Sequence, residues 1–395
     1  MAMAMPLASR APSPMNASWP VVVVGAGVAG SFMAARLAHA GVRVLLVEKS
    51  SFPRPKVCGA CLSGRALAVL DQSGIPAMAG LPKKLGMIPL DCFRLGTTAG
   101  EATVALGAGG ALSRIAFDAA LAEEARRCGA TVWEGTEAVA VEDGAGFKRL
   151  RLQAPDGSRD VGARLVVIAD GLGGKLSGRL LPGSVARNSR IGAGCVLGPD
   201  HAGSYAPGII HMACGAGGYL GLVRQEDGSL DLAMAADRPA ILAAGGPGIL
   251  AEQWLESCRW PVPPGLGRAA WRGTPPLTRK RVAGVPGIVA VGDAAGYLEP
   301  FTGEGMGWAL EGAESLSRIV LSEMSRGNPG AAHVRWAREH ARVSRRRHAA
   351  CRIMAGALRI RGLPALAVRL LRWFPGAAWP VTWLLDRQSV PRRSP

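Results

Sequence analysis

A chain of 395 residues has room for two or three domains and a sizeable core, and its 49% hydrophobic residues exclude a largely disordered protein. The formal net charge of +17 is concentrated at one end, because residues 331–395 contain fourteen arginines and only two acidic residues. These arginines alternate with leucine, isoleucine and tryptophan, and no nucleic-acid-binding motif accompanies them. The charge therefore favours a membrane surface over a nucleic acid as a partner.

The first elements alternate between strand and helix. Residues 1–19 have neither a long apolar core nor a basic start, so we interpret them as a flexible leader and not as a signal peptide. Apolar runs predict buried strands at residues 21–24 and 42–47, and helical spacing predicts a helix over residues 31–40. This order is typical of a dinucleotide-binding unit.

The turn after the first strand carries a phosphate-binding motif. In GAGVAG, Gly25 permits a tight turn, Gly27 lets a pyrophosphate approach the backbone, and Gly30 packs helix on strand. Glu48 ends the second strand, where a carboxylate can accept hydrogen bonds from ribose hydroxyls. A glycine-rich turn in a nucleotide-free domain is the alternative, but strand, turn, helix, strand and acid are all present.

The middle of the chain changes from mixed to strand-rich patterns. Helices are expected at residues 65–72 and 115–128, and strands at 131–142 and 164–169. From residue 191 to 282 alternating strands separated by glycine-rich turns predict a second, sheet-rich domain, with strands at 208–213, 218–224 and 230–236.

Residues 287–310 return to nucleotide-binding features. An apolar strand delivers Asp293 into small residues, and Pro300 and three glycines (303, 305 and 307) precede an apolar helical pattern that continues over residues 312–326. Small residues allow the backbone to approach a flat ligand, and a helix start offers free N–H groups and a positive dipole end.

The basic tail is expected to be helical, with breaks at Pro364, Pro375 and Pro380. Its longest charge-free stretch, residues 373–385, is too short and too rich in proline and glycine to span a bilayer. Two interpretations stay open: a helix packed on the enzyme with a solvated arginine face, or a lid or surface anchor that admits greasy substrates from a bilayer.

Residues 20–325 resemble the superfamily of FAD-dependent monooxygenases and geranylgeranyl reductases, whose fold is similar to that of aromatic hydroxylases. Three segments carry the resemblance: the opening fingerprint, the segment VVIADGLGGKLSGRL (residues 166–180) and the Gly292-Asp293 segment. The resemblance implies a mixed α/β fold with a Rossmann-like FAD-binding domain, an interleaved β-sheet substrate domain and a C-terminal helical tail.

The expected domain boundaries correspond to these three parts. We assign residues 20–84, 111–182 and 283–326 to the FAD-binding domain, 85–110 and 183–282 to the substrate domain, and 327–395 to the tail.

The family pattern implies a set of cofactor contacts. Glu48 would bind the adenosine ribose, Asp293 the ribityl chain, and the helix after Gly303 would face N1 and the C2 carbonyl of the flavin and stabilise negative charge there. Arg114 and the backbone near Ala138 and Val139 match family contacts to FAD and its adenine. The full expected set is Gly25, Gly27, Ala29, Gly30, Glu48, Lys49, Arg54, Cys58, Arg114, Val139, Asp170, Asp293, Pro300, Gly303, Gly305 and Met306.

The segment after Asp170 departs from the hydroxylase pattern. That family usually has a serine and an arginine after Asp-Gly, but Gly174 and Ser177 occupy those offsets here and Arg179 is displaced. The motif helps to bind both FAD and NAD(P)H in that family, so the departure weakens the case for direct use of NADPH. Asp170 either caps a turn or contacts the cofactor.

The loop FPRPKVCGACLS resembles the segment beside the isoalloxazine ring in reductase-like members. Arg54 and Cys58 are candidates for cofactor or substrate contacts there. Cys58 and Cys61 form a CxxC pair, but a redox or zinc site needs a thioredoxin context or a second pair, and the sequence has neither, so no metal site is predicted.

Two residues are candidates for catalysis. Tyr219 could place a phenol against the substrate, or lie half-buried on a sheet face. Glu299 could act as an acid or base facing the flavin, or cap the following helix. His211, on the neighbouring strand, is interpreted as a core or surface histidine.

The first functional hypothesis is an NAD(P)H-dependent monooxygenase that hydroxylates an apolar aromatic, polyketide or phenolic-lipid substrate with O2 through a peroxyflavin. The segments LEPFTGEGM and GGYLGLVRQEDG carry this similarity. The alternative is a geranylgeranyl-reductase-type enzyme that saturates an isoprenoid chain by hydride transfer, which the CGACLS loop and the tail favour. A halogenase, whose WxWxIP motif is missing, and a flavin-binding regulator rank below these.

The expected cofactors are FAD and, as a transient reductant, NADPH or NADH. The expected partners are an apolar or lipid substrate, O2 and a membrane surface contacted by the tail, with no nucleic acid. The eight cysteines show no spacing typical of a disulfide framework, so we expect reduced thiols and a cytoplasmic protein that also contacts the membrane periphery.

Overall fold

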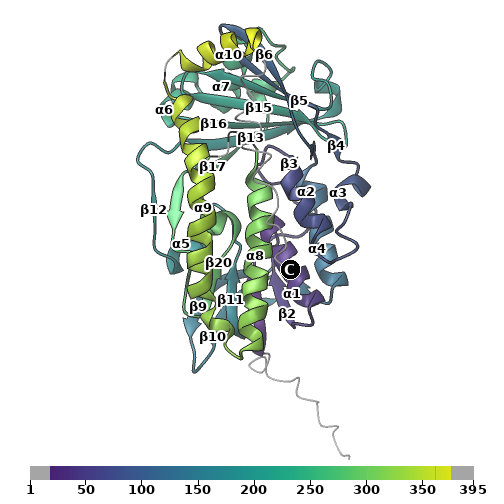
Figure 1. Cartoon of the computed structure of the whole chain (residues 1–395), viewed down its shortest axis with the longest axis vertical. Helices are drawn as coiled ribbons and strands as arrows, with labels where there is room; N and C mark the ends of the chain where they lie inside the picture. The colour runs from purple at the N-terminus through teal and green to yellow at the C-terminus, as the bar shows by residue number, and fades with distance from the viewer. Residues whose placement is uncertain (1–17, 300, 302, 361, 375–395) are drawn as a thin grey trace, which may run out of the picture.

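Apolar strands from distant parts of the chain form a mixed sheet with a parallel centre in the lower half of Figure 1. The computed structural model describes residues 18–299, 301, 303–360 and 362–374. In this sheet the order is β19-β20-β11-β1-β2-β8, with β1 parallel to β2 and β11, and the β9–β10 hairpin continuing from β11. The bounds are β1 Ser18–Val24, β2 Val44–Val47, β8 Thr131–Trp133, β9 Glu137–Asp143, β10 Lys148–Ala154, β11 Gly157–Ile168, β19 Gly284–Val285 and β20 Ile288–Ala290.

Four helices cover one face of this sheet. Phe32 of α1, Phe117 of α4, Leu70 of α2 and Leu310 of α8 are buried in one apolar core with Val21 of β1. Their bounds are α1 Val28–His39, α2 Gly64–Asp71, α4 Arg114–Arg127 and α8 Gly305–Ser325; the shorter α3 (Leu81–Lys84) and α5 (Lys175–Leu180) lie at the periphery.

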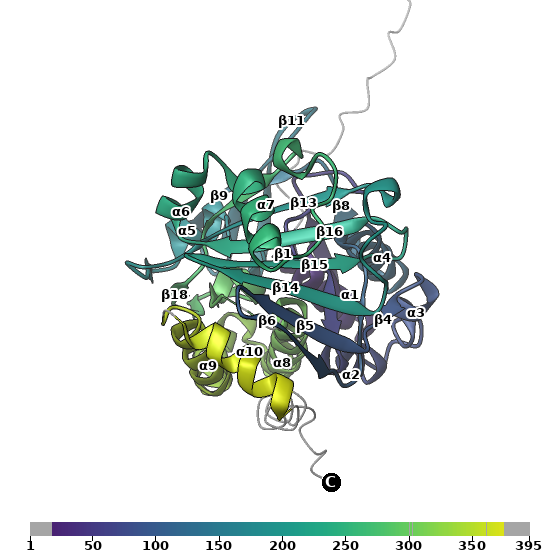
Figure 2. The same cartoon turned by 90° about the horizontal axis from the view of Figure 1, so that it is seen from above.

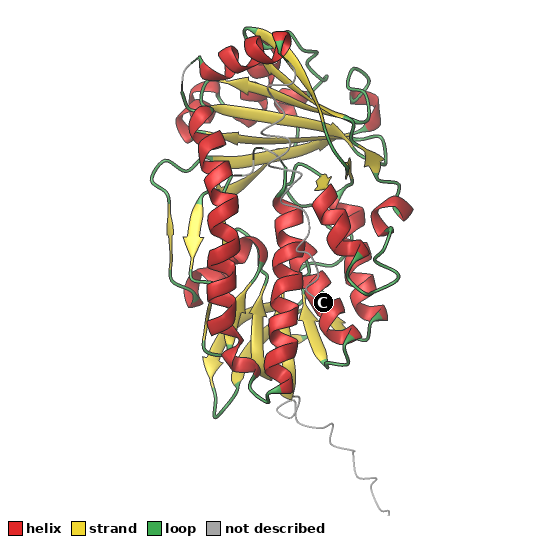
Figure 3. Cartoon of the chain, viewed as in Figure 1, coloured by secondary structure: helices red, strands yellow, loops and turns green. Residues whose placement is uncertain are grey.

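The second large sheet lies at the opposite end of the molecule (Figure 3). Its seven strands follow the order β17-β13-β16-β15-β14-β5-β6. Trp254 of α7 packs in the core on one side of this sheet, near α6. The bounds are β5 Cys92–Thr97, β6 Gly100–Ala105, β13 Ile191–Leu197, β14 Ile209–Gly215, β15 Gly218–Arg224, β16 Leu230–Ala236, β17 Arg272–Pro276, α6 Arg238–Ala244 and α7 Pro247–Ser257.

Two small sheets connect the halves. They are β3-β7-β4 (Cys61–Ser63, Gly109–Ala111 and Ile88–Pro89) and β12-β18-β21 (Gly183–Val185, Arg279–Arg281 and Gly296–Tyr297).

The C-terminal helices pack on both halves. α9 (Ala332–Ala357) lies beside α8, where Trp336 Nε1 donates a 2.7 Å hydrogen bond to the carbonyl oxygen of Ala290. α10 (Leu363–Trp373) lies across β5 and β6 (Figure 2). Its own residue Val368 is fully buried. Among the residues that the structure describes, no helix is both long and apolar enough to cross a membrane.

The fold class expected from the sequence is confirmed, and local boundaries differ for identifiable reasons. Residues 131–142 form two strands, because Gly135 adopts a φ of +62° between them. Ser18 and Trp19, expected in the leader, begin β1. The helix expected after the glycines includes Gly305 and Gly307. Pro364, expected as a break, is the second residue of α10, and proline is well tolerated in the first turn of a helix. Pro375 and Pro380 lie outside the described residues.

Candidate active site

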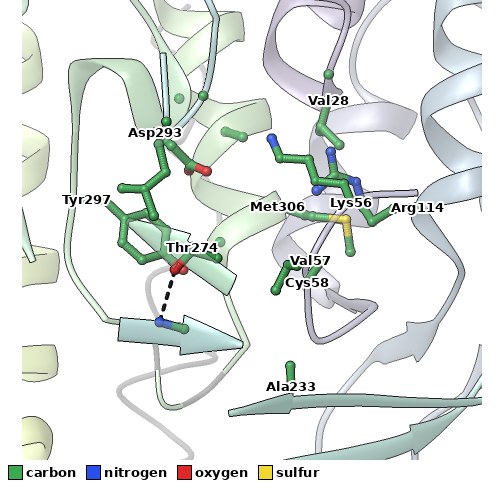
Figure 4. Close-up of a pocket in the computed structure, with 18 of the residues that line it drawn as sticks. Val28, Lys56, Val57, Cys58, Arg114, Ala233, Thr274, Asp293, Tyr297 and Met306 are labelled. Carbon is green, nitrogen blue, oxygen red and sulfur yellow. Dashed lines mark hydrogen bonds between the residues drawn. The ribbon is translucent and has the colours of Figure 1, made fainter. Parts of the chain in front are cut away.

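A cavity of about 580 Å³ lies between the two halves of the molecule. Its lower part is formed by the ends of β1, β2 and β11, and its upper part by strands of the seven-stranded sheet. Figure 4 shows Asp293 and Tyr297 on one wall, Lys56, Arg114 and Met306 on the other, and Ala233 on β16 below them.

The turn between β1 and α1 is closely packed. Gly25 has a φ of +100°, and a Cβ atom there would lie 2.4 Å from the carbonyl oxygen of Ala169. A Cβ atom on Gly30 would lie 1.9 Å from the carbonyl oxygen of Gly25. Both glycines are therefore required to bring the start of α1 against the end of the sheet.

Three cationic side chains surround Gly27 at the start of α1. A Cβ atom on Gly27 would lie 3.7 Å from Arg114 Nη2 and 3.8 Å from both Arg54 Nη2 and Lys56 Nζ. The first N–H groups of α1 and its dipole add further positive potential at the same place. This combination fits a pyrophosphate group, the central part of a dinucleotide.

Carboxylates fix the orientation of the two arginines. Arg114 Nε and Nη2 each donate a 2.7 Å hydrogen bond to the fully buried Asp118, and Arg54 Nη1 lies 3.3 Å from the same carboxylate. Within the described chain, no carboxylate lies at ion-pair distance from Lys56. Burial and the neighbouring charge of Arg114 lower the pKa of Lys56. A bound anion beside Gly27 would oppose this effect and stabilise the charged form of Lys56.

Glu48 lies at the end of β2 and lines the cavity. Its carboxylate accepts hydrogen bonds from the N–H groups of Ala26 (2.9 Å) and Ser50 (3.1 Å) and lies 3.3 Å from Arg54 Nη2. The turn and the second strand are thus held in register where the sequence predicts a ribose contact.

Asp170 binds the start of α5 and also lines the cavity. Its Oδ2 accepts a 3.0 Å hydrogen bond from the N–H of Ser177 in α5, and Oδ1 has no hydrogen-bond partner among the described residues. Burial raises the pKa of this carboxyl group. A Cβ atom on Gly174 would lie 2.0 Å from the Asp170 carboxylate, which explains why a glycine replaces the serine of the hydroxylase pattern.

The start of α8 also points into the cavity. Gly303, Gly305 and Met306 line it, and Asp293 reaches it from the turn after β20. A Cβ atom on Gly307 would lie 2.9 Å from Ser63 Oγ, so this glycine allows α8 to pack closely on the start of α2. The cavity therefore has a helix N-terminus at two places, which fits the pyrophosphate and the flavin ring of FAD.

The upper part of the cavity is mostly apolar. Phe93, Met212, Ala233 and Ala235 line it together with Tyr219, whose ring packs edge-on against Phe301 at 4.9 Å. Burial, with the nearby Glu299 carboxylate, raises the pKa of Tyr219 well above its usual value.

The upper part of the cavity also contains a carboxyl group, that of Asp231, which the sequence analysis missed. It lies on β16, is 6% exposed, and its Oδ2 has no hydrogen-bond partner among the described residues. Burial raises the pKa of Asp231 well above its usual value, and the charge of Arg114 partly opposes this effect. Burial thus favours the protonated form of Asp231. Only its alternation with Ala233 and Ala235 on one face of the strand could have indicated its position.

The structure brings most of the expected site residues to this cavity, but three described ones, Gly30, Val139 and Glu299, do not line it. Gly30 is buried behind the turn, and Val139 lies on β9, where its carbonyl oxygen accepts a hydrogen bond from Arg179. Pro300 lies outside the described residues. The polar residues near the cavity that the sequence analysis did not select include Lys56, Asp118 and Asp231.

Glu299 corrects the sequence-based expectation. It neither lines the cavity nor caps α8, because its buried carboxylate lies 2.9 Å from Nη1 of the fully buried Arg190. Burying a charge requires a partner, and this ion pair supplies it. Glu299 thus lies next to Tyr219, which lines the cavity, and does not line the cavity itself.

The FAD binding domain family matches residues 18–181. Menaquinone reductase from Mycobacterium tuberculosis is 31% identical over 322 residues, which cover 76% of each chain. Digeranylgeranylglycerophospholipid reductase 1 from Methanothermobacter thermautotrophicus is 26% identical over 332 residues, covering 78% of each chain.

Solved structures share the fold. A geranylgeranyl bacteriochlorophyll reductase-like protein from Thermoplasma acidophilum superposes with a TM-score of 0.73 at 20% identity, covering 94% of this chain and all of the other. The myxobacterial chondrochloren halogenase superposes with a TM-score of 0.72 at 21% identity, covering 84% and 80%. The chain belongs to the superfamily of FAD-dependent oxidoreductases that includes the menaquinone and geranylgeranyl reductases.

Proposed function

We propose that this protein uses FAD and NADH or NADPH to reduce a carbon–carbon double bond in an isoprenoid lipid. Two sequence relatives support this reaction, because they are named menaquinone reductase and digeranylgeranylglycerophospholipid reductase 1. Each of them matches about three quarters of both chains. The apolar upper part of the cavity suits a hydrocarbon substrate.

The observation that carries the proposal is the buried carboxyl group of Asp231, which lines the cavity and whose Oδ2 has no hydrogen-bond partner among the described residues. Saturating a double bond requires a hydride on one carbon and a proton on the other, and bound FAD supplies the hydride. Within the described lining, the strands of the seven-stranded sheet contribute one carboxyl group, that of Asp231. Asp231 would donate its proton to the second carbon, and its carboxylate would then be stabilised by the charge of Arg114.

The remaining residues bind and orient. Arg54, Lys56 and Arg114 would hold the pyrophosphate, and the start of α8 with Asp293 would hold the flavin end. Phe93 and Met212 would exclude water from the reacting carbons. The Asp231 carboxylate would take up a new proton from solvent after each turnover.

Anaerobic turnover tests the proposal. The purified yellow protein is incubated with NADPH or NADH and a prenylated quinone in detergent micelles, and the product mass is measured. We expect a gain of two hydrogen atoms without oxygen. Hydroxylation, the reaction first expected from the sequence, would instead give a product only after oxygen is admitted, with one oxygen atom incorporated, and would overturn the proposal.

A further inference from the structure

The outer face of α10 is an exposed apolar surface bordered by arginines. Leu366, Leu370, Trp373 and Phe374 recur at helical spacing, and Trp373 and Phe374 are 82% and 66% exposed. Arg369 and Arg372 lie exposed on the same helix. We call the four apolar residues and these two arginines the α10 face.

The opposite side of α10 anchors the helix to the enzyme. Val368 is fully buried, and Leu358 and Leu371 pack against the same apolar cluster. Just before α10, Arg359 Nη2 donates a 2.7 Å hydrogen bond to the carbonyl oxygen of Asn188, and Arg359 Nη1 lies 3.3 Å from Asp237. Because these contacts hold α10 in place, its exposed side chains are a fixed feature of the surface.

The apolar cluster beneath α10 is also a wall of the cavity. It contains Met212, Tyr219 and Phe301, which line the cavity, together with Val368 of α10. The inner side of α10 and the cavity therefore share one apolar cluster.

Charge selects the occupant of this face. Residues 353–374 contain four arginines and no acidic residue. A second copy of the chain would bring the same positive charge against it. Residues 375–395 carry three arginines and one aspartate, so they offer no complementary charge either. An anionic lipid surface supplies both negative headgroups for the arginines and hydrocarbon for Trp373, Phe374 and the leucines.

We propose that the α10 face docks the enzyme on an anionic bilayer, so that a lipid substrate passes along the apolar cluster into the cavity. Docking itself is independent of the reaction, whereas its use in substrate delivery rests on the proposed function.

Vesicle co-sedimentation of the full chain tests docking without substrate or NAD(P)H. We expect binding to vesicles of phosphatidylcholine with phosphatidylglycerol, and little binding to phosphatidylcholine alone. The double variant Leu370→Gln with Trp373→Gln should lower the partition coefficient more than about tenfold. The variant Arg369→Gln with Arg372→Gln should lower it about tenfold on anionic vesicles only.

The matched control is Leu242→Gln, which changes a 67% exposed leucine on α6 and should bind as the parent protein does. Circular dichroism checks that each variant is folded. Docking is overturned if the parent protein fails to sediment with anionic vesicles, or if the apolar variant binds equally well. It is also overturned if the parent protein is a dimer that the variant Leu370→Gln with Trp373→Gln dissociates. A third contradicting result would be that the protein binds vesicles only after residues 375–395 are removed by proteolysis. Normal docking with no turnover would contradict the reaction and leave docking supported.

Discussion

At the scale of single residues, the site contains buried ionisable side chains that the sequence pattern does not indicate. Lys56 lies in the loop FPRPKVCGACLS and Asp231 in an alternating strand, and neither pattern marks these two residues. The fold places Lys56 beside Arg54 and Arg114, and Asp231 on the mostly apolar sheet face. Removing such groups from water is costly, so their presence in a cavity indicates that a ligand interacts with them.

The substitution Asp231→Asn removes the proton that we assign to reduction while keeping the shape of the side chain. We expect lipid reduction to fall by about 100- to 10,000-fold, whereas FAD binding and anaerobic reduction of the flavin by NAD(P)H stay unchanged. Stopped-flow spectroscopy separates the two half-reactions. Asp200→Asn, at an exposed position, is the control. Undiminished lipid reduction in Asp231→Asn would remove this residue as the proton donor.

The substitution Lys56→Gln tests the cationic cluster around Gly27. Losing one charge-assisted hydrogen bond of about 1.5–3 kcal/mol should raise the Kd for FAD roughly 10- to 150-fold. Titration of the apoprotein by flavin fluorescence measures this change. Lys84→Gln, at the exposed end of α3, should bind FAD normally. An unchanged Kd would show that Lys56 does not contact the cofactor.

At the scale of elements, close backbone contacts position the two helix starts that face the cavity. α1 approaches the sheet at Gly25 and Gly30, and α8 approaches α2 at Gly307. A side chain at any of these positions would push a helix start away from the cavity, so packing and ligand binding depend on the same glycines.

The substitution Gly30→Ala should lower the free energy of unfolding by about 3 kcal/mol, because its Cβ atom would lie 1.9 Å from a backbone oxygen that cannot move aside. Gly356→Ala is the matched control: this glycine lies in α9 with open space around it, so the change should stabilise the protein by about 0.5–1 kcal/mol. Urea unfolding measures both values. Equal stabilities for the two variants would contradict the packing argument.

At the scale of the whole molecule, the seven-stranded sheet has its own buried polar groups. His211 of β14 lies between the rings of Tyr205 and Trp260, at centroid distances of 4.9 and 5.5 Å. Burial, followed by the charge of Arg94, lowers the pKa of His211 to about 4. This histidine is therefore neutral in the folded protein at pH 5, where the unfolded chain binds a proton.

This difference predicts an acid-sensitive fold. Above the unfolded pKa of about 6.5 His211 has no effect on the pH dependence, and between that value and about 4 the unfolded state gains protons and stability falls as pH falls. From pH 7 to pH 5 the loss should be about 2 kcal/mol. Urea unfolding of His211→Met should lack this part of the loss. The exposed His39→Gln should retain it. Identical pH profiles for parent and His211→Met would refute the prediction.

Much of the fold could be predicted because its signals are local. The GxGxxG turn, the strand to Glu48 and the alternating strands at residues 218–224 and 230–236 each fit a period or motif within a few residues. The helices α6 and α7 were missed in a region read as strands, since short helices over a sheet depend on packing more than on pattern.

The sequence by itself determined a dinucleotide-binding turn, an FAD-type architecture and a basic, apolar C-terminus, because spacing along the chain encodes these properties directly. Only the tertiary structure decided that Lys56 faces Gly27, that Glu299 pairs with Arg190 behind Tyr219, and that Asp231 lies alone on an apolar face. Those relations join residues far apart in sequence, and their energies come from burial and proximity, which no local pattern records.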